Sequence, residues 1–112
     1  MKNIMSFEEC PYYDQEHKGD IKWQTLLPKG EMGKLKIGYV RLKGPANLIS
    51  NNHTKWHQLY LVISGSGTVI LDEKEYKVKA PCIVKIPCKT EHMAKVSVGE
   101  KMEYIYVNDY ID

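Results

Sequence analysis

The amino-acid sequence predicts an all-β protein, either a small β-barrel or a β-sandwich, and three observations support this. Short apolar or β-branched runs recur along most of the 112-residue chain. Glycine, proline and acidic turn residues separate these runs at short, regular intervals. No stretch shows the 3.6-residue apolar period of an amphipathic helix. Many short strands joined by tight turns are typical of a sandwich or barrel.

The strands are expected where an apolar run lies between two turn signals. The expected strands are 21–23, 35–42, 58–63, 68–71, 76–78, 83–86, 93–98 and 102–107. The turn signals are Pro28-Lys29-Gly30, Lys43-Gly44-Pro45, Gly65-Ser66-Gly67, Asp72-Glu73-Lys74, Ala80-Pro81, Pro87 and Val98-Gly99. Glycine adopts positive φ without steric cost and proline cannot donate to a strand ladder, so we expect each strand to end at its signal.

The chain is expected to form one domain. Residues 1–34 are expected to form an irregular N-terminal arm and the first strands, packed on the barrel. The arm is expected because the first twenty residues contain Pro11 and show little periodicity. Residues 35–112 are expected to form the barrel core. A chain of this length buries about 65% of its unfolded surface, which is enough for independent folding.

Composition excludes several classes of function. The 16 basic and 14 acidic residues are interspersed and give a net charge of +2, so neither a nucleic-acid footprint nor a membrane-surface patch is expected. No apolar run reaches about 18 residues, so no transmembrane helix is expected. The charged N-terminus does not match a signal peptide, and three cysteines do not match a disulfide framework. A cytoplasmic location is therefore expected.

Strand 58–63 is apolar on both faces. Leu59, Leu61 and Ile63 alternate with Tyr60 and Val62. A strand of this kind is normally buried on both faces. One face would point into the barrel, and the other needs a cover from the N-terminal arm or from a second subunit. We favour a homodimer.

Two blocks of sequence carry imidazoles beside apolar strands or a proline turn. The first, 51–67, contains His53, His57 and Gln58, and the second, 86–92, contains Pro87 and His92. Nitrogen ligands held on a rigid scaffold are what a transition-metal site requires. The two blocks therefore predict a metal centre.

In order and spacing the two blocks resemble the two motifs of the cupin superfamily, G-x5-H-x-H-x3,4-E-x6-G and G-x5-P-x-G-x2-H-x3-N. Counting back from Gly65 places Gln58 at the acidic position, His53 at the second histidine and Asn51 at the first. In the second motif only the proline and the histidine are kept, as Pro87 and His92. The positions of its two glycines and its asparagine hold Pro81, Lys89 and Val96. The resemblance covers residues 35–107 and implies a jelly-roll-like cupin barrel.

The resemblance implies a divalent metal ion, Zn, Mn, Ni or Fe, at His53 and His92. Gln58 would stand for the usual carboxylate and Asn51 for the missing histidine, and an amide is the weaker ligand in both places. His57 compensates if its loop turns the ring inward. The alternative is structural: His53 and His92 as hydrogen-bonded polar histidines, Gln58 as a buried amide, and His57 as a surface or dimer-contact residue.

A rival arrangement uses Cys88. Together with His92, His53 and His57 it would form a structural zinc site of one cysteine and three histidines. Cys88 lies in the expected turn, which disfavours this arrangement. Cys10 and Cys82 are expected to be small buried apolar residues.

Tyrosines are expected to line a ligand pocket. Tyr60, Tyr104 and Tyr106 share the even-numbered parity of Gln58, so they would present hydroxyl tips on an apolar interior wall. Trp56 would close the mouth of this pocket or cover a dimer contact. The alternative for each of these residues is ordinary core or interface packing.

Two classes of function fit these features. In the first, a divalent ion acts as a Lewis acid in an isomerase or epimerase on a sugar or keto acid, with a tyrosine or His57 as base; a metal-dependent dioxygenase is a variant of this class. In the second, the protein binds or senses a small polar molecule without turnover. The amide at position 58, where a metalloenzyme would carry a glutamate, favours the second class.

Overall fold

A computed structural model describes residues 1–12, 18–48, 51–52 and 54–111. The elements in chain order are η1 (Phe7–Glu9), β1 (Lys18–Leu27), β2 (Leu35–Asn47), β3 (Asn51–Asn52), β4 (Trp56–Leu71), β5 (Lys74–Lys79), β6 (Cys82–Ile86), β7 (Glu91–Val96) and β8 (Lys101–Tyr110). The described part of the chain contains no α-helix, and it has no helix long and apolar enough to cross a membrane. The all-β prediction is confirmed.

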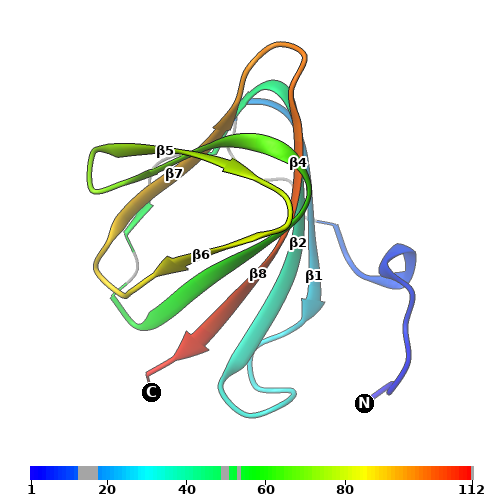
Figure 1. Ribbon diagram of the computed structural model, residues 1–112. Coiled ribbons are helices and arrows are strands. Elements are labelled where there is room, and N and C mark those ends of the chain that lie inside the picture. The colour runs from blue at the N-terminus through cyan, green and yellow to red at the C-terminus, as the bar shows by residue number, and fades with distance from the viewer. Residues whose placement is uncertain (13–17, 49–50, 53, 112) are drawn as a thin grey trace.

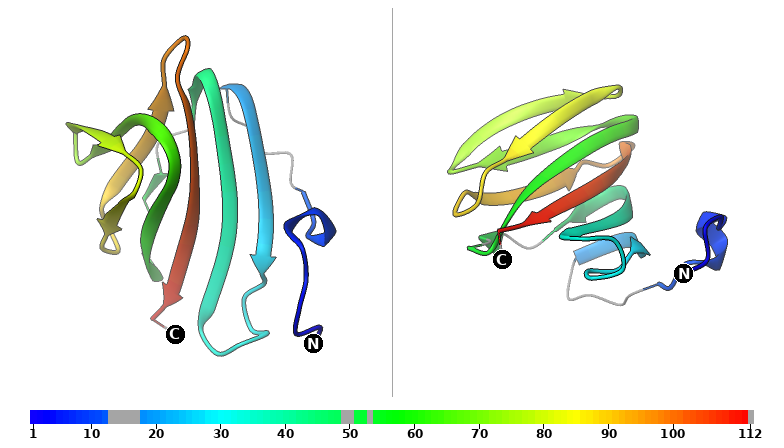
Figure 2. Two further views of the ribbon diagram at one scale, coloured as in Figure 1. Left: turned by 45° about the vertical axis from the view of Figure 1, so that its right-hand side comes forward. Right: turned by 90° about the horizontal axis from the view of Figure 1, so that it is seen from below.

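The strands form one eight-stranded antiparallel sheet that curls into a small barrel (Figure 1). The first half of β4 pairs with β8 and β6, and its second half pairs with β7 and β5. A β2–β7 pairing links the two sides near Ala46 and Val96. Below, the side made of β1, β2, β8, β6 and the first half of β4 is called the β8 wall. The other side is made of β3, β5, β7 and the second half of β4, lies opposite the β8 wall in Figure 2, and is called the β7 wall.

β4 runs through the Gly65-Ser66-Gly67 sequence, so the prediction of a strand end there is wrong. Gly65 adopts φ +78°, and the β4–β8 register shifts between Val62 and Ser64. A Cβ atom on Gly65 would lie 1.8 Å from the Lys101 carbonyl oxygen. The glycine permits a close backbone approach and a bulge that redirects the strand into the β7 wall. β2 likewise continues past the expected turn at Gly44.

The predicted hairpin between 68–71 and 76–78 is confirmed. Leu71 pairs with Lys74, and the two intervening residues, Asp72 and Glu73, have φ +46° and +70°. Two consecutive positive φ values are the geometry of a two-residue hairpin whose twist matches the flanking strands.

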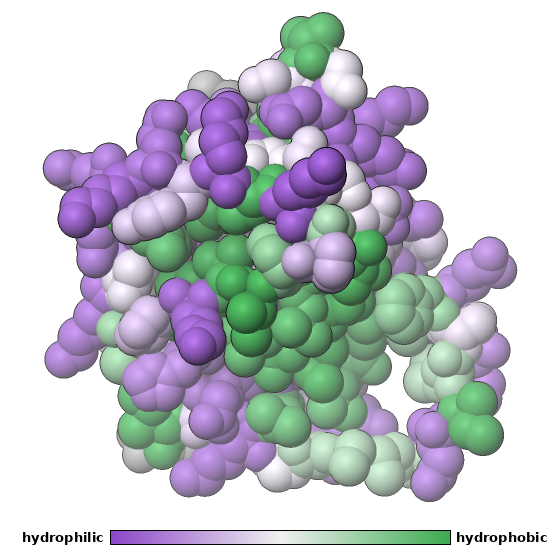
Figure 3. Space-filling view, viewed as in Figure 1, coloured by the Kyte–Doolittle hydropathy of each residue, from purple (hydrophilic) through white to green (hydrophobic). Residues whose placement is uncertain are grey.

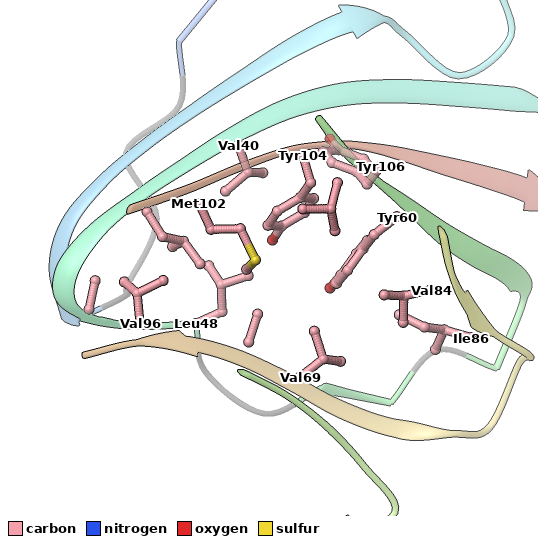
Figure 4. Packing of buried hydrophobic residues seen from close by; sticks show 14 residues of the cluster. Val40, Leu48, Tyr60, Val69, Val84, Ile86, Val96, Met102, Tyr104 and Tyr106 are labelled. Atoms are coloured by element: carbon pink, nitrogen blue, oxygen red, sulfur yellow. The ribbon is translucent and has the colours of Figure 1, made fainter. Parts of the chain in front are cut away.

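The core lies inside the barrel, between the two walls (Figure 4). Even-numbered residues of β8 and of the first half of β4 point inward, and odd-numbered residues there point out. Beyond the bulge in β4, Val69 and Leu71 face the core. Tyr104 and Met102 are completely buried, and Tyr60 is 3% exposed. The remaining buried apolar members are Val40, Leu42, Ala46, Leu48, Val62, Val69, Val84, Ile86, Ala94, Val96 and Tyr106.

The N-terminal arm packs on β1. The Thr25 amide donates to the Pro11 carbonyl over 3.1 Å, Gln24 Nε2 donates to the Phe7 carbonyl, and the Phe7 and Tyr39 rings lie 5.6 Å apart. β1 itself is a full member of the β8 wall, paired with β2 along most of its length.

Gly38 makes room for the ring of Tyr106. The two residues are register partners, and a Cβ atom on Gly38 would lie 2.0 Å from the Tyr106 ring. Trp23 packs on the same ring with centroids 5.2 Å apart, so the ring has no space to withdraw.

We therefore expect Gly38→Ala to lower the free energy of unfolding by about 1–3 kcal/mol, the usual cost of overpacking a core. Urea denaturation monitored by circular dichroism measures this. In a Tyr106→Val background, the same Gly38→Ala change should cost much less, because the clashing ring is gone. Equal stability of Gly38→Ala and the parent protein would contradict this account.

Candidate functional site

Gln58 is a buried amide inside the barrel with one unsatisfied atom. It is 8% exposed and pairs across the β4–β8 ladder with Asn108, which is 4% exposed. Gln58 Nε2 donates to Asn108 Oδ1 over 2.7 Å. Gln58 Oε1 is buried and has no hydrogen-bond partner within the described residues. A buried acceptor costs about 1–3 kcal/mol unless a water or a ligand satisfies it.

His92 is held inside the barrel as a neutral imidazole. It lies on β7, is 5% exposed, and its Nδ1 is 3.2 Å from the Thr90 carbonyl oxygen. Because a carbonyl only accepts, Nδ1 carries the proton in this bond and Nε2 carries the lone pair. Burial lowers the pKa of His92, and the Thr90 bond only partly opposes this. A neutral ring with an oriented Nε2 can bind a ligand or a metal.

The three predicted tyrosines all face the interior, which their parity indicates. Tyr60, Tyr104 and Tyr106 are at most 3% exposed. The Tyr60 ring meets the His92 ring edge-on at 6.3 Å and lies 4.2 Å from the Tyr104 ring. Burial raises the pKa of Tyr60 and of Tyr104, so both remain protonated phenols at neutral pH. A buried phenol of this kind donates a hydrogen bond and is poorly suited to be a base.

Trp56 lies at the end of the barrel. It is partly exposed, pairs with Tyr110 at the start of the β4–β8 ladder, and stacks on that residue with ring centroids 4.9 Å apart. It has the parity of Gln58. Both roles predicted for Trp56, closing the mouth of the pocket or covering a dimer contact, stay predictions.

The structure does not bring His57 together with Gln58 and His92. His57 is exposed on the outer side of β4, where its Nδ1 accepts a hydrogen bond from the Cys88 amide over 3.0 Å. The arrangement of Cys88, His57 and His92 as one zinc site is therefore not formed, because strand alternation places the two rings on opposite faces.

The remaining candidate ligands can be placed only partly. His53 lies outside the described residues. The backbone of Asn51, on β3, is the register partner of His92 on β7. Within the described residues no group of three or more His, Cys, Asp or Glu side chains could hold a metal ion.

Sequence reasoning missed Asn108. The signal was available, because Asn108 continues the even parity of Tyr104 and Tyr106 on β8. It was overlooked because it carries no charge and matches no motif position. The structure shows it as the hydrogen-bond partner of Gln58.

A crevice of about 350 Å³ opens between the edges of β5 and β6. Its inner part includes the core residues Val69 and Val84. Val84 is the register partner of Tyr60, so the crevice adjoins the polar interior. The other lining residues are Leu71, Tyr76, Lys77, Val78, Lys79, Cys82, Ile83 and Lys85, which include three lysines and no acidic residue. In Figure 3, apolar surface gathers in the middle of this face, with hydrophilic side chains around it.

The same architecture occurs in solved structures over nearly the whole chain. A predicted oxalate decarboxylase from Thermotoga maritima matches with TM-score 0.87 and 17% identity, over 96% of this chain and 99% of that one. A cupin-like protein from the same organism matches with TM-score 0.79 and 16% identity, over 98% and 83%. The chain has the cupin fold. The polyketide cyclase RemF from Streptomyces resistomycificus shares this fold with TM-score 0.81 and 12% identity, over 100% and 87%.

No protein-family model matches the sequence, and no curated protein matches it. At these identities the cupin fold establishes the architecture alone. Function has to be argued from the site, because one fold carries many activities.

The lowered pKa of His92 predicts a pH dependence of stability. In the unfolded chain His92 has the ordinary histidine pKa of 6.5, whereas in the folded protein its pKa is lower. Stability is therefore expected to fall as the pH drops below 6.5. The pKa values of Glu100 and Glu103 are also lowered, but from an ordinary value of 4.5. These two carboxylates therefore change stability at a lower pH than His92 does.

We expect melting temperature to decrease between pH 7 and pH 5, and to decrease less in His92→Gln. The other three histidines are present in both proteins, so the difference between the two profiles isolates His92. Parallel profiles would show that His92 is not held neutral by burial.

Proposed function

We propose that this cupin-fold protein binds a small polar molecule inside the barrel, at the group formed by Gln58, His92, Asn108 and Tyr60. The observation that carries the proposal is the buried, unpartnered Oε1 of Gln58. Tyr60, two residues along the same face of β4, offers a protonated phenol, and its ring meets the neutral imidazole of His92 edge-on at 6.3 Å. An apolar wall with a few oriented polar groups is typical of small-molecule sites.

The groups at this site suggest the chemistry of the ligand. They are amides, a phenol and an imidazole, all uncharged, so they suit the hydroxyl and carbonyl oxygens of a sugar or keto acid. The crevice between β5 and β6 reaches Val84, the register partner of Tyr60. Its lysines, Lys77, Lys79 and Lys85, favour the approach of an anion. A small keto acid combines both properties.

Binding without turnover is better supported than isomerisation. The raised pKa values of Tyr60 and Tyr104 disfavour a tyrosine base, and His57 lies on the outer face. Isomerisation would therefore have to use the neutral imidazole of His92 as its base, whereas binding needs the same groups only as hydrogen-bond partners. Proteins of this fold include a predicted decarboxylase and a cyclase by name, so the fold itself permits either outcome.

A divalent metal at the same place is a second candidate, supported by the Nε2 lone pair of His92. The described residues do not fit a metal ion by themselves, because they supply one imidazole and the neutral oxygen of Gln58. His53 would have to complete the set. When bound, such an ion would polarise a ligand oxygen as a Lewis acid. Oxygen activation is less supported, because amides bind iron or manganese weakly.

Ligand binding is tested by thermal shift with pyruvate, 2-oxoglutarate and D-glucose. We expect at least one to raise the melting temperature of the protein and to lose this effect in Gln58→Leu, which removes both amide atoms at similar volume. His57→Leu is the matched control, since it changes the neighbouring residue on the outer face, and it should keep the shift. No response from any of the three, or a response unchanged in Gln58→Leu, would contradict the proposed site.

The metal candidate is tested by Gln58→Glu. With an ion within reach, the new carboxylate is a strong ligand, and added Zn²⁺, Mn²⁺ or Ni²⁺ should raise the melting temperature. Without an ion, a buried carboxylate beside Asn108 lowers stability or titrates at a raised pKa. Metal analysis should then show that His92→Ala and His53→Ala each lose bound metal while His57→Ala keeps it. A destabilised Gln58→Glu with no metal rescue would eliminate the metal candidate and leave the ligand proposal standing.

A further inference from the structure

The outer side of the β8 wall carries a continuous apolar face, formed by Leu59, Leu61, Ile63, Ile83, Ile105 and Val107. These residues are the odd-numbered members of β4, β6 and β8, and the pairing of Leu61 with both Ile83 and Ile105 makes them neighbours. Leu61, Ile63 and Ile83 are 40%, 50% and 51% exposed. The sequence predicted that this side of β4 is covered, and in the single chain it is not. A contiguous exposed apolar face is typical of an interaction surface.

The N-terminal arm does not cover this face. Its contacts in the described residues are with β1 and β2, through Gln24, Thr25 and Tyr39. Figure 2 shows the arm beyond β1, on the opposite side of the molecule from β6. Of the two covers that the sequence allowed, the arm is thereby set aside.

Opposite charges flank the apolar face. Lys85 lies on the β6 side and Asp109 on the β8 side, and both are exposed. No ion pair within the described residues holds either of them. Both also line a shallow outer groove of about 370 Å³, whose apolar part includes Leu59 and Val107. The two borders of the face therefore each carry one charge outside any ion pair, Lys85 on one and Asp109 on the other, with apolar residues between them.

We propose that a second copy of this chain covers the face, in a two-fold dimer of barrels packed through their β8 walls. A two-fold axis in the interface plane and along β4 places β4 on β4 and β6 of one copy over β8 of the other. Apolar side chains then meet apolar side chains, and Lys85 of each copy faces the β8 side of the other, which carries Asp109. The surface is complementary to itself, so the interaction is isologous and closes at two subunits.

The dimer contact adjoins the proposed binding site. Ile83 and Lys85 line the crevice and also belong to the dimer face or its border, and Gln58 is among the residues that line the outer groove. The two sites can still be tested by different variants, because Gln58 is buried inside the barrel whereas Leu61 is exposed on the outer side of β4.

Light scattering at micromolar concentration tests the dimer. We expect twice the chain mass of 13.0 kDa. Leu61→Lys should shift the mass to that of one chain, because each dimer would bury two lysines in its apolar centre. Val98→Lys is the matched control: Val98 is 81% exposed on the turn before β8, away from the face, and this variant should remain dimeric. Leu61 is exposed in the single chain, so circular dichroism should show both variants folded.

Charge reversal tests the arrangement of the two copies. Lys85→Asp should raise the dissociation constant at least about threefold, a change expected of one surface charge. Lys85→Asp combined with Asp109→Lys should return it toward the parent value. A single-chain mass for the parent protein, or a dimer unaffected by Leu61→Lys, would overturn the proposal. A different result would be that Leu61→Lys breaks the dimer while the double variant Lys85→Asp, Asp109→Lys binds no more tightly than Lys85→Asp alone. That result would overturn the axis along β4.

Discussion

β4 belongs to both walls of the barrel, so the alternation of its side chains controls what faces the interior. One residue of slip along β8 or β6 would move Gln58 and Tyr60 outside and put Leu59 and Leu61 inside. The bulge near Gly65 lets the strand change walls without a break. The polar interior, the apolar outer face and the position of His57 all follow from this one register.

The polar groups inside this barrel reduce its stability. In a low-dielectric core, an amide acceptor without a partner costs free energy that leucine at the same position would not. Gln58 and Asn108 satisfy each other only in part. The interior avoids the larger cost of a buried charge, because burial keeps His92 neutral and Tyr60 protonated. Polar side chains arranged in this way can hold an oxygen-rich molecule by hydrogen bonds.

Strand parity made much of the interior predictable from sequence. Gln58, Tyr60, Tyr104 and Tyr106 lie where a period of two residues puts them, and the acidic hairpin at Asp72 formed as its turn chemistry indicates. The predicted end of strand 58–63 was wrong because a glycine is equally compatible with a turn and with a bulge. At Gly65 only the close approach of the Lys101 carbonyl, which the sequence does not reveal, distinguishes the two. The hydrogen bond to Asn108 depends on pairing across fifty residues of chain, which no local pattern contains.

The apolar outer face and the polar interior are formed by alternate residues of the same two strands, β4 and β8. β4 and β8 place polar groups inward, where most sheets bury apolar ones, so their apolar residues on the outer side are needed to hold the wall together. Covering Leu61 and Ile83 with a second copy would contribute burial that the interior gives up at Gln58, Asn108 and His92. Dimerisation through this wall would also restrain the register of β4 against β8, and hence the pairing of Gln58 with Asn108. Association and ligand binding would then be linked through one strand, whose inner side holds Gln58 and whose outer side holds Leu61.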